Sequence, residues 1–247
     1  MDRMIYTAMS GAKQILEQQA TVAHNLANAA TTGFRAQIDS FRAVPIIGEG
    51  LPTRAFVVDA TVGTDFSLAP IQQTGNALDV AVKTDGFIAV QREDGSEAYT
   101  RNGAFKISEN GILQTQSGQT VLGDGGPITI PANTAVGIAA DGTVSGIPTE
   151  GKATAVNTLG RIKLVKPPTQ NLIRGGDGLF SLPNNVPADA DPAVKLASGA
   201  IESSNVNVVD AMVDMISLAR QFETQMKLLQ NAENNATKAA QLLSLNA

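Results

Sequence analysis

The chain has 247 residues, of which 43% are hydrophobic, so it is long enough to bury a core as one large domain or two modest ones. Its 18 basic and 23 acidic residues give a formal charge of −5 without any Lys/Arg-rich run, so we expect no nucleic-acid partner. The absence of cysteine excludes disulfides, thiolate metal sites and a cysteine nucleophile. No segment has the apolar length of a membrane span, and the N-terminus lacks the pattern of a secretory signal, so we expect neither a membrane-spanning protein nor a cleaved signal peptide.

The first predicted element is a helix from about Asp2 to Thr31. Apolar residues recur there at alternating steps of three and four, which is the seam of a heptad with one polar member. At 1.5 Å per residue this helix is roughly 44 Å long. The seam, which we expect to lie in a subunit interface, consists of Ile5, Ala8, Ala12, Ile15, Gln19, Val22 and Leu26.

The end of this helix is unusually polar, with the sequence HNLANAATTGFRA. Asn25 and Asn28 are three residues apart and lie on one face beside Leu26, so their amides either meet a neighbouring subunit or face solvent. We expect both to belong to the interface. Gly33 is the expected left-handed residue that caps the C-terminus of the helix.

The middle of the chain has the pattern of strands and turns. Residues 1–35 are assigned to the N-terminal helix, and residues 36–73, rich in Pro, Gly and Thr, are expected to form an extended connector. Residues 74–183 are expected to form a central β domain, because short alternating runs are separated by dipeptides that accept positive φ. These dipeptides are Asp85-Gly86, Asp94-Gly95, Asn102-Gly103, Asn110-Gly111, Asp124-Gly125, Asp141-Gly142 and Asp177-Gly178.

A second connector, residues 184–204, precedes a predicted C-terminal helix over residues 205–247. Asn205 or Asn207 is expected to cap its start. The expected interface seam of this helix is Met212, Met215, Ala219, Phe222, Met226, Leu229 and Glu233, of which only Glu233 is polar. The methionines are either plain core residues or adaptable contacts to slightly different neighbours.

The stripes raise the question of what covers the two helices. They either pack on the β domain or form a bundle, and their narrow stripes with many small residues favour the bundle. We therefore predict an α+β fold in which long N- and C-terminal helices form a coiled-coil-like bundle beside a β-hairpin-rich central domain. The second helix is longer than the first, so other chains are expected to cover the remaining seam, and the helices to become ordered on assembly.

The motifs argue against an enzyme. The lone His24 has no serine or cysteine motif beside it, and the sequence lacks the patterns of nucleotide, zinc and calcium sites. We expect no catalytic, cofactor-binding or metal-binding residues.

Three separated motifs resemble one family. MSGAKQILEQQATVAHNLANAATTGFRA resembles the N-terminal signature of flagellar basal-body rod and hook proteins, and SGAIESSNVNVVDAMVDMISLARQFETQMKLL (198–229) resembles their C-terminal signature. LDVAVKTDGFIAVQ, YTRNGAFKI and GPITIP are similar to their β domain. MDRMIYTAMSGA, FRAVPI, GRIKLVKP and RQFETQMKLL resemble the proximal-rod members. The pairs His24-Asn25 and Phe222-Glu223 depart from the distal-rod members.

The resemblance implies a structural subunit of the proximal rod of the bacterial flagellum. In that family the terminal helices pack with those of neighbours as an inner tube, with the β domain outside. The implied partners are copies of itself, other proximal and distal rod proteins and the flagellar type III export apparatus. The implied location is the basal body, where the rod crosses the periplasm and transmits torque. The alternatives are a distal-rod paralogue and a secreted β-rich adhesin.

Overall fold

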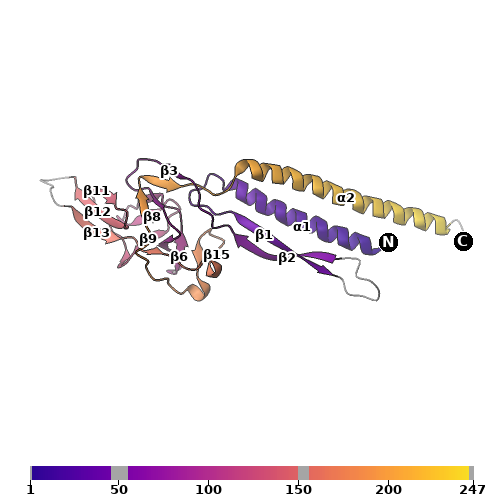
Figure 1. The fold of residues 1–247 in the computed structure, drawn as a ribbon, viewed down its shortest axis with the longest axis horizontal. Coiled ribbons are helices and arrows are strands. Elements are labelled where there is room, and N and C mark those ends of the chain that lie inside the picture. The colour runs from indigo at the N-terminus through magenta and orange to yellow at the C-terminus, as the bar shows by residue number, and fades with distance from the viewer. Residues whose placement is uncertain (1, 46–54, 150–155, 245–247) are drawn as a thin grey trace. The chain divides into compact units, whose positions relative to one another are not determined.

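The computed structural model describes residues 2–45, 55–149 and 156–244, and in these residues the protein is mostly β, with one α-helix near each end (Figure 1). The predicted α+β fold organised by a coiled-coil-like bundle is therefore wrong. The apolar stripes indicate which side of each helix is packed, but they do not identify the element that packs against it. For the N-terminal helix the cover is the C-terminal helix together with a β-hairpin of the same chain.

The chain divides into two compact units. Among the described residues, unit 1 contains 2–29, 36–45, 55–65 and 206–244, and unit 2 contains 30–35, 66–149 and 156–205.

Unit 1 consists of two helices and one hairpin. Helix α1 (Asp2–Ala27) packs against helix α2 (Val208–Ser244) and against strands β1 (Gln37–Pro45) and β2 (Ala55–Thr64), and Figure 1 shows the helices side by side. The side chain of Asn207 starts α2, because its Oδ1 accepts hydrogen bonds from the backbone N–H groups of Val209 (3.0 Å) and Asp210 (3.5 Å). Of the two expected caps, Asn207 is therefore confirmed. Residues 245–247 of the predicted C-terminal helix lie outside the described residues.

Strands β1 and β2 lie in the stretch expected as an extended connector. They are antiparallel, with Gln37 opposite Thr64 and Pro45 opposite Ala55, and a register shift falls between Ser40 and Phe41. In β1 half-buried and exposed side chains mostly alternate, as expected of a strand with one covered face. The Pro and Gly content of this region concealed that alternation.

Unit 2 contains the remaining strands. The principal sheet has the order β15-β16-β6-β5-β9-β8-β7, with β10 paired to β9 and β14 paired to β5, and the smaller sheets are β11-β12-β13, β17-β4 and β18-β3. The strands are β3 (Ile71–Gln73), β4 (Val80–Val82), β5 (Phe87–Gln91), β6 (Glu97–Thr100), β7 (Phe105–Ile107), β8 (Leu113–Thr115), β9 (Thr120–Gly123), β10 (Gly126–Pro127), β11 (Thr134–Ile138), β12 (Thr143–Pro148), β13 (Asn157–Arg161), β14 (Leu164–Val165), β15 (Ile173–Arg174), β16 (Phe180–Ser181), β17 (Leu196–Ser198) and β18 (Ala200–Glu202). Two short 3-10 turns, η1 (Thr169–Asn171) and η2 (Pro183–Asn185), lie between these strands.

Four of the predicted turn dipeptides join paired strands with a glycine at positive φ. Their glycines are Gly95 between β5 and β6, Gly111 between β7 and β8, Gly142 between β11 and β12, and Gly178 between β15 and β16. These hairpins are confirmed.

The dipeptide Asn102-Gly103 does not form the predicted hairpin, because β6 pairs with β5 and β16 whereas β7 pairs with β8. Gly103 instead lies against the backbone of Val80: its carbonyl accepts a hydrogen bond from the Val80 N–H (2.9 Å), and a Cβ at Gly103 would be 1.8 Å from the Val80 carbonyl oxygen. The glycine lets its segment lie close against the backbone of β4 at Val80, and it makes no turn between paired strands.

An aromatic cluster lies on one side of the principal sheet, built on Phe87, Tyr99 and Phe180, with Phe66 packed against it. The Tyr99 side chain is fully buried, and its hydroxyl accepts a hydrogen bond from the Ala188 N–H (2.7 Å). Burial raises the pKa of Tyr99 to about 12, although the Ala188 hydrogen bond acts in the opposite direction.

We predict that Tyr99 ionises at about pH 12 in the folded protein. The chain has two tyrosines, so a Tyr6→Phe variant leaves Tyr99 as the sole source of the tyrosinate absorbance. Because the folded pKa is above the ordinary 10.0, the contribution of this group to stability is complete below pH 10 and is lost as the pH rises toward 12. A tyrosinate signal appearing at pH 10 while circular dichroism remains native would contradict this environment.

Candidate functional site

The predicted seam of α1 lies on the covered side of the helix. Ala12 and Ile15 are buried, and the other seam members are partly buried. The partly buried members are Ile5, Ala8, Gln19, Val22 and Leu26. Because α1 packs against α2, β1 and β2, these side chains contact other parts of the same chain.

A neighbouring face of α1, about 100° around the helix from the seam, is also largely apolar, and it is exposed. Its residues again recur at steps of three and four, and Lys13 is the one charged member. We call these residues the outer stripe of α1: Tyr6, Met9, Lys13, Leu16, Ala20, Ala23 and Ala27. Tyr6, Met9 and Leu16 are 57%, 53% and 49% exposed. A helix whose apolar residues extend over two neighbouring faces is normally covered on both.

On α2 some of the packed residues differ by one position from the members of the predicted interface seam. It consists of Ala211, Met215, Leu218, Phe222, Gln225, Leu229 and Ala232, which are buried or partly buried. Of the predicted seam, Met215, Ala219, Phe222 and Leu229 are partly buried, whereas Met212, Met226 and Glu233 are exposed. The sequence allowed either register, because apolar residues occupy several adjacent stripes of this helix.

The exposed side of α2 carries a run of large apolar residues near its start. Val209, Met212, Val213 and Ile216 are each at least half exposed. Val213 and Ile216 border a shallow groove of about 340 Å³ whose other lining residues are Ser217, Arg220, Gln221 and Thr224. We call Val209, Met212, Val213 and Ile216 the outer patch of α2.

The two asparagines at the end of α1 have partners inside the chain. The Asn25 side chain makes two hydrogen bonds to the backbone of Gln37: Nδ2 donates to the carbonyl oxygen and Oδ1 accepts from the N–H, both at 2.9 Å. Asn28 Nδ2 donates to the His24 carbonyl oxygen at 2.9 Å. Asn25 therefore holds the first residue of β1 beside α1, which explains a polar residue at this position without a neighbouring subunit.

Helix α1 ends at Ala27, earlier than the predicted Thr31, so Gly33 does not cap it. Gly33 does have the expected positive φ of 68°, but for a different reason. Its N–H donates to the Glu202 carbonyl oxygen (2.8 Å), and a Cβ would be 2.4 Å from the Asn102 nitrogen and 2.5 Å from the Arg101 carbonyl carbon. Gly33 thus lets residues 30–35 lie directly on the backbone of Arg101 and Asn102, within unit 2.

A buried ion-pair cluster lies beside this contact. The Glu202 carboxylate accepts hydrogen bonds from Arg35 Nη2 at Oε1 and from Arg101 Nε at Oε2, both at 2.6 Å. The Ala69 N–H also donates to Oε1 at 3.1 Å. The side chains of Arg35, Arg101 and Glu202 are 0%, 3% and 1% exposed, so we call these three residues the buried Arg-Glu-Arg cluster.

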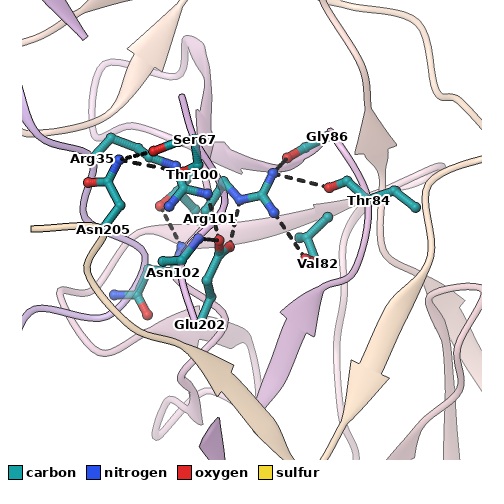
Figure 2. Close-up of polar contacts among 11 residues, drawn as sticks. Arg35, Ser67, Val82, Thr84, Gly86, Thr100, Arg101, Asn102, Glu202 and Asn205 are labelled. Atoms are coloured by element: carbon teal, nitrogen blue, oxygen red, sulfur yellow. Dashed lines mark hydrogen bonds and ion pairs between the residues drawn. The ribbon is translucent and has the colours of Figure 1, made fainter. Parts of the chain in front are cut away.

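Arg101 is held by backbone oxygens as well. Figure 2 shows its guanidinium reaching the carbonyl oxygens of Val82 (3.0 Å), Thr84 (3.2 Å) and Gly86 (2.9 Å). Burial lowers the pKa of Arg101, and the charge and hydrogen bond of Glu202 oppose that shift. The position of Arg101 is therefore fixed by four acceptor residues from two segments of unit 2, residues 82–86 and Glu202.

A third arginine covers the same segment. Arg174 Nη1 donates to the Arg35 carbonyl oxygen (2.6 Å), and its guanidinium lies 4.5 Å from the centroid of the Phe34 ring. Burial lowers the pKa of Arg174. Arg174 consequently holds this segment at two points, the backbone carbonyl of Arg35 and the side chain of Phe34.

Sequence reasoning missed the cluster. The available signal was the alternation of β18, which places Glu202 on the same buried side as Ala200. A carboxylate at a buried position requires a cationic partner, but the partners are 167 and 101 residues away, so their identity could not be read from the local pattern.

Family comparisons match all three regions that contribute to the cluster. The flagella basal body rod protein model matches residues 5–35, the flagellar hook protein FlgE/F/G D1 domain model matches residues 81–146, and the flagellar basal body rod FlgEFG protein C-terminal model matches residues 197–242. Each match contains one member of the cluster. The chain belongs to the flagellar basal-body rod protein family, a family of structural subunits of the basal body.

Within that family the chain is similar to proteins named FlgF. It is 47% identical over 251 residues to the flagellar basal-body rod protein FlgF of Escherichia coli (strain K12), and 46% identical over 251 residues to that of Salmonella typhimurium (strain LT2). Both matches cover 99% of this chain and 100% of the relative. The flagellar basal-body rod protein FlgG of Bacillus subtilis (strain 168) is 30% identical over 257 residues, with 94% of this chain and 96% of the relative covered.

We predict that Glu202→Gln lowers the free energy of unfolding of the full chain by about 3–5 kcal/mol, because two buried guanidiniums lose their counter-charge. The control is Asp85→Asn, which removes an ion pair at 3.8 Å whose side chains are 50% and 74% exposed. Such a surface pair contributes about 0–1 kcal/mol. Equal losses for the two variants in urea unfolding would show that the cluster is not a structural anchor.

We also predict that Gly33→Ala is more damaging than Gly75→Ala. Both glycines have φ near 70°, but a Cβ at Gly75 meets nothing within 4 Å, whereas one at Gly33 meets backbone atoms. The additional loss in unfolding free energy should be about 1–3 kcal/mol, the usual cost of an overpacked site. The measurement is again urea unfolding, and a Gly33→Ala variant as stable as Gly75→Ala would contradict the close contact.

Proposed function

We propose that this chain is a subunit of the proximal rod that polymerises with copies of itself and with other rod proteins. The observation that carries the proposal is the outer stripe of α1, a largely apolar face that the described residues of the chain leave exposed. Relatives named as basal-body rod proteins support it along the whole length of the chain.

The outer stripe of α1 is suited to another helix. Exposed apolar faces of this extent mark interaction surfaces in proteins that remain soluble. Its second half consists of Ala20, Ala23 and Ala27, whose small side chains let a neighbouring backbone approach closely, and its first half carries Tyr6, Met9 and Leu16. We propose that a neighbouring subunit covers this face in the rod.

Helix α2 supports the same proposal. Its 37 residues extend about 56 Å, whereas the 26 residues of α1 extend about 39 Å. Residues 233–238 are exposed on all sides of the helix, and turns without packing are marginal in water. The exposed members of the predicted interface, Met212, Met226 and Glu233, together with the outer patch of α2, are therefore proposed contacts to neighbours. Such contacts order the end of α2 on assembly.

A polymer of this kind grows when one subunit presents different faces to its two neighbours and the contact does not close into a ring. The resulting helical rod transmits torque across the periplasm. We propose export by the flagellar type III apparatus, and the cysteine-free sequence is compatible with threading of an unfolded chain. In the part of the chain that the structure describes, no helix combines the length and apolar character needed to cross a membrane.

The test is Leu16→Asp, which places a charge in the outer stripe of α1. Because Leu16 is half exposed, the monomer should lose only about 1–2 kcal/mol of stability, from lost apolar burial and lower helix propensity, whereas motility in soft agar and recovery of the chain in purified basal bodies should be abolished. Asn110→Asp is the control, since it adds the same charge at an exposed turn between β7 and β8 and should leave motility unchanged. Normal incorporation of a stably folded Leu16→Asp chain would refute the proposed interface.

A further inference from the structure

Helix α1 has a third face, and this face is polar. Its residues recur at steps of three or four, on the side of the helix away from the seam. We call these residues the polar stripe of α1: Ser10, Gln14, Glu17, Thr21 and Asn25. A polar face of this kind is normally left to water.

The β1–β2 hairpin covers the polar stripe instead. Thr21 Oγ1 donates a hydrogen bond to Asp39 Oδ1 at 2.9 Å, close to the two bonds between Asn25 and the backbone of Gln37. Further along the hairpin, Ser10 Oγ donates to the Val57 carbonyl oxygen at 3.4 Å. Figure 1 shows α1 between α2 and the hairpin. The hairpin is therefore held firmly where β1 begins and weakly beyond that point.

Little apolar burial supports this contact. Where the structure describes the side chains of β1 and β2, at residues 37–45, 55–58, 63 and 64, none is buried. Burial of apolar surface is the dominant stabilising term in packing, and a two-stranded hairpin alone is marginal in water. The position of the hairpin on α1 consequently depends on a few hydrogen bonds.

The middle of the polar stripe opposes the contact. Among the described residues, Gln14 Oε1 and Glu17 Oε2 are buried without a hydrogen-bond partner. The other Glu17 oxygen lies 3.5 Å from Lys13 Nζ at the surface. A buried acceptor without a partner has lost its hydration, and it regains water when its cover is removed. These two oxygens therefore favour separation of the hairpin from α1.

We propose that the β1–β2 hairpin is a strap that lifts from α1 while the helices remain packed. The strap pivots near Gln37 and Asp39, where the strong hydrogen bonds lie, and the register shift between Ser40 and Phe41 follows directly. Lifting hydrates the buried oxygens and opens the polar stripe, a face separate from the outer stripe of α1, to other molecules. The proposal is independent of the proposed assembly, because every contact in it lies within one chain.

The test measures how fast a single cysteine reacts with a thiol reagent under native conditions, in the full-length chain, which has no cysteine of its own. Gln14→Cys places the thiol under the strap. Ala12→Cys places it in the seam, where residue 12 is 8% exposed. The thiol at position 14 should react at least about ten-fold faster than the thiol at position 12, because lifting the strap opens less of the structure than exposing the seam.

Two substitutions, each combined with Gln14→Cys, should change this rate in opposite directions. Glu17→Met removes the unpaired oxygen and should slow the reaction about ten-fold, whereas Thr21→Val removes the hydrogen bond to Asp39 and should accelerate it about five-fold. Lys13→Met is the matched control. It removes the same surface ion pair as Glu17→Met but keeps the buried oxygen, so the rate should stay within about three-fold.

Two results would overturn the proposal. Equal rates at positions 12 and 14 would show that the hairpin separates only when the whole of unit 1 opens. A rate at position 14 that neither Glu17→Met nor Thr21→Val changes would show that the thiol is reached without any lifting of the strap.

Discussion

The buried carboxylate of Glu202 is the interaction on which unit 2 depends. It accepts hydrogen bonds from two guanidiniums and from a backbone amide, and so joins residues 30–35, the end of β6 and the end of β18. A buried ion pair is costly to form and more costly to break on one side. Its value here is specificity of position: Glu202 pairs with Arg35 through its carboxylate and accepts the Gly33 N–H hydrogen bond at its carbonyl oxygen.

The cluster also joins the three sequence regions that the family models match. Arg35, Arg101 and Glu202 fall within the three separate family matches, so the two terminal regions and the central domain are joined by one carboxylate. Apolar stripes lie beyond these anchors, on α1 and α2. The chain therefore has its buried polar anchor in unit 2 and its exposed apolar stripes in unit 1.

Local patterns predicted those parts of the fold that depend on local chemistry. Helical periodicity located α1 and α2, Asn207 was among the expected caps, and Asp-Gly and Asn-Gly pairs located four hairpins. Features set by distant residues were not predictable in this way. Gly103 was expected in a turn but instead lies in close contact with the backbone of Val80. The apolar stripes with steps of three and four could not distinguish a partner helix from the β1–β2 hairpin. The one-residue difference between the packed and the predicted seam of α2 also depends on distant residues. Several adjacent stripes of this helix are apolar, and only packing selects among them.

The exchange rate of the Gly33 amide hydrogen tests the role of the cluster most directly, because that amide donates to the Glu202 carbonyl oxygen at 2.8 Å. The reference is the Ala89 amide of β5, which donates to the Lys163 carbonyl oxygen at 3.0 Å inside the principal sheet. If Glu202 fixes residues 30–35 as part of the cooperative core, both amides exchange through the same global opening, with equal free energies in the isolated full-length chain. Gly33 exchanging at the rate of an open loop while Ala89 remains protected would contradict that role.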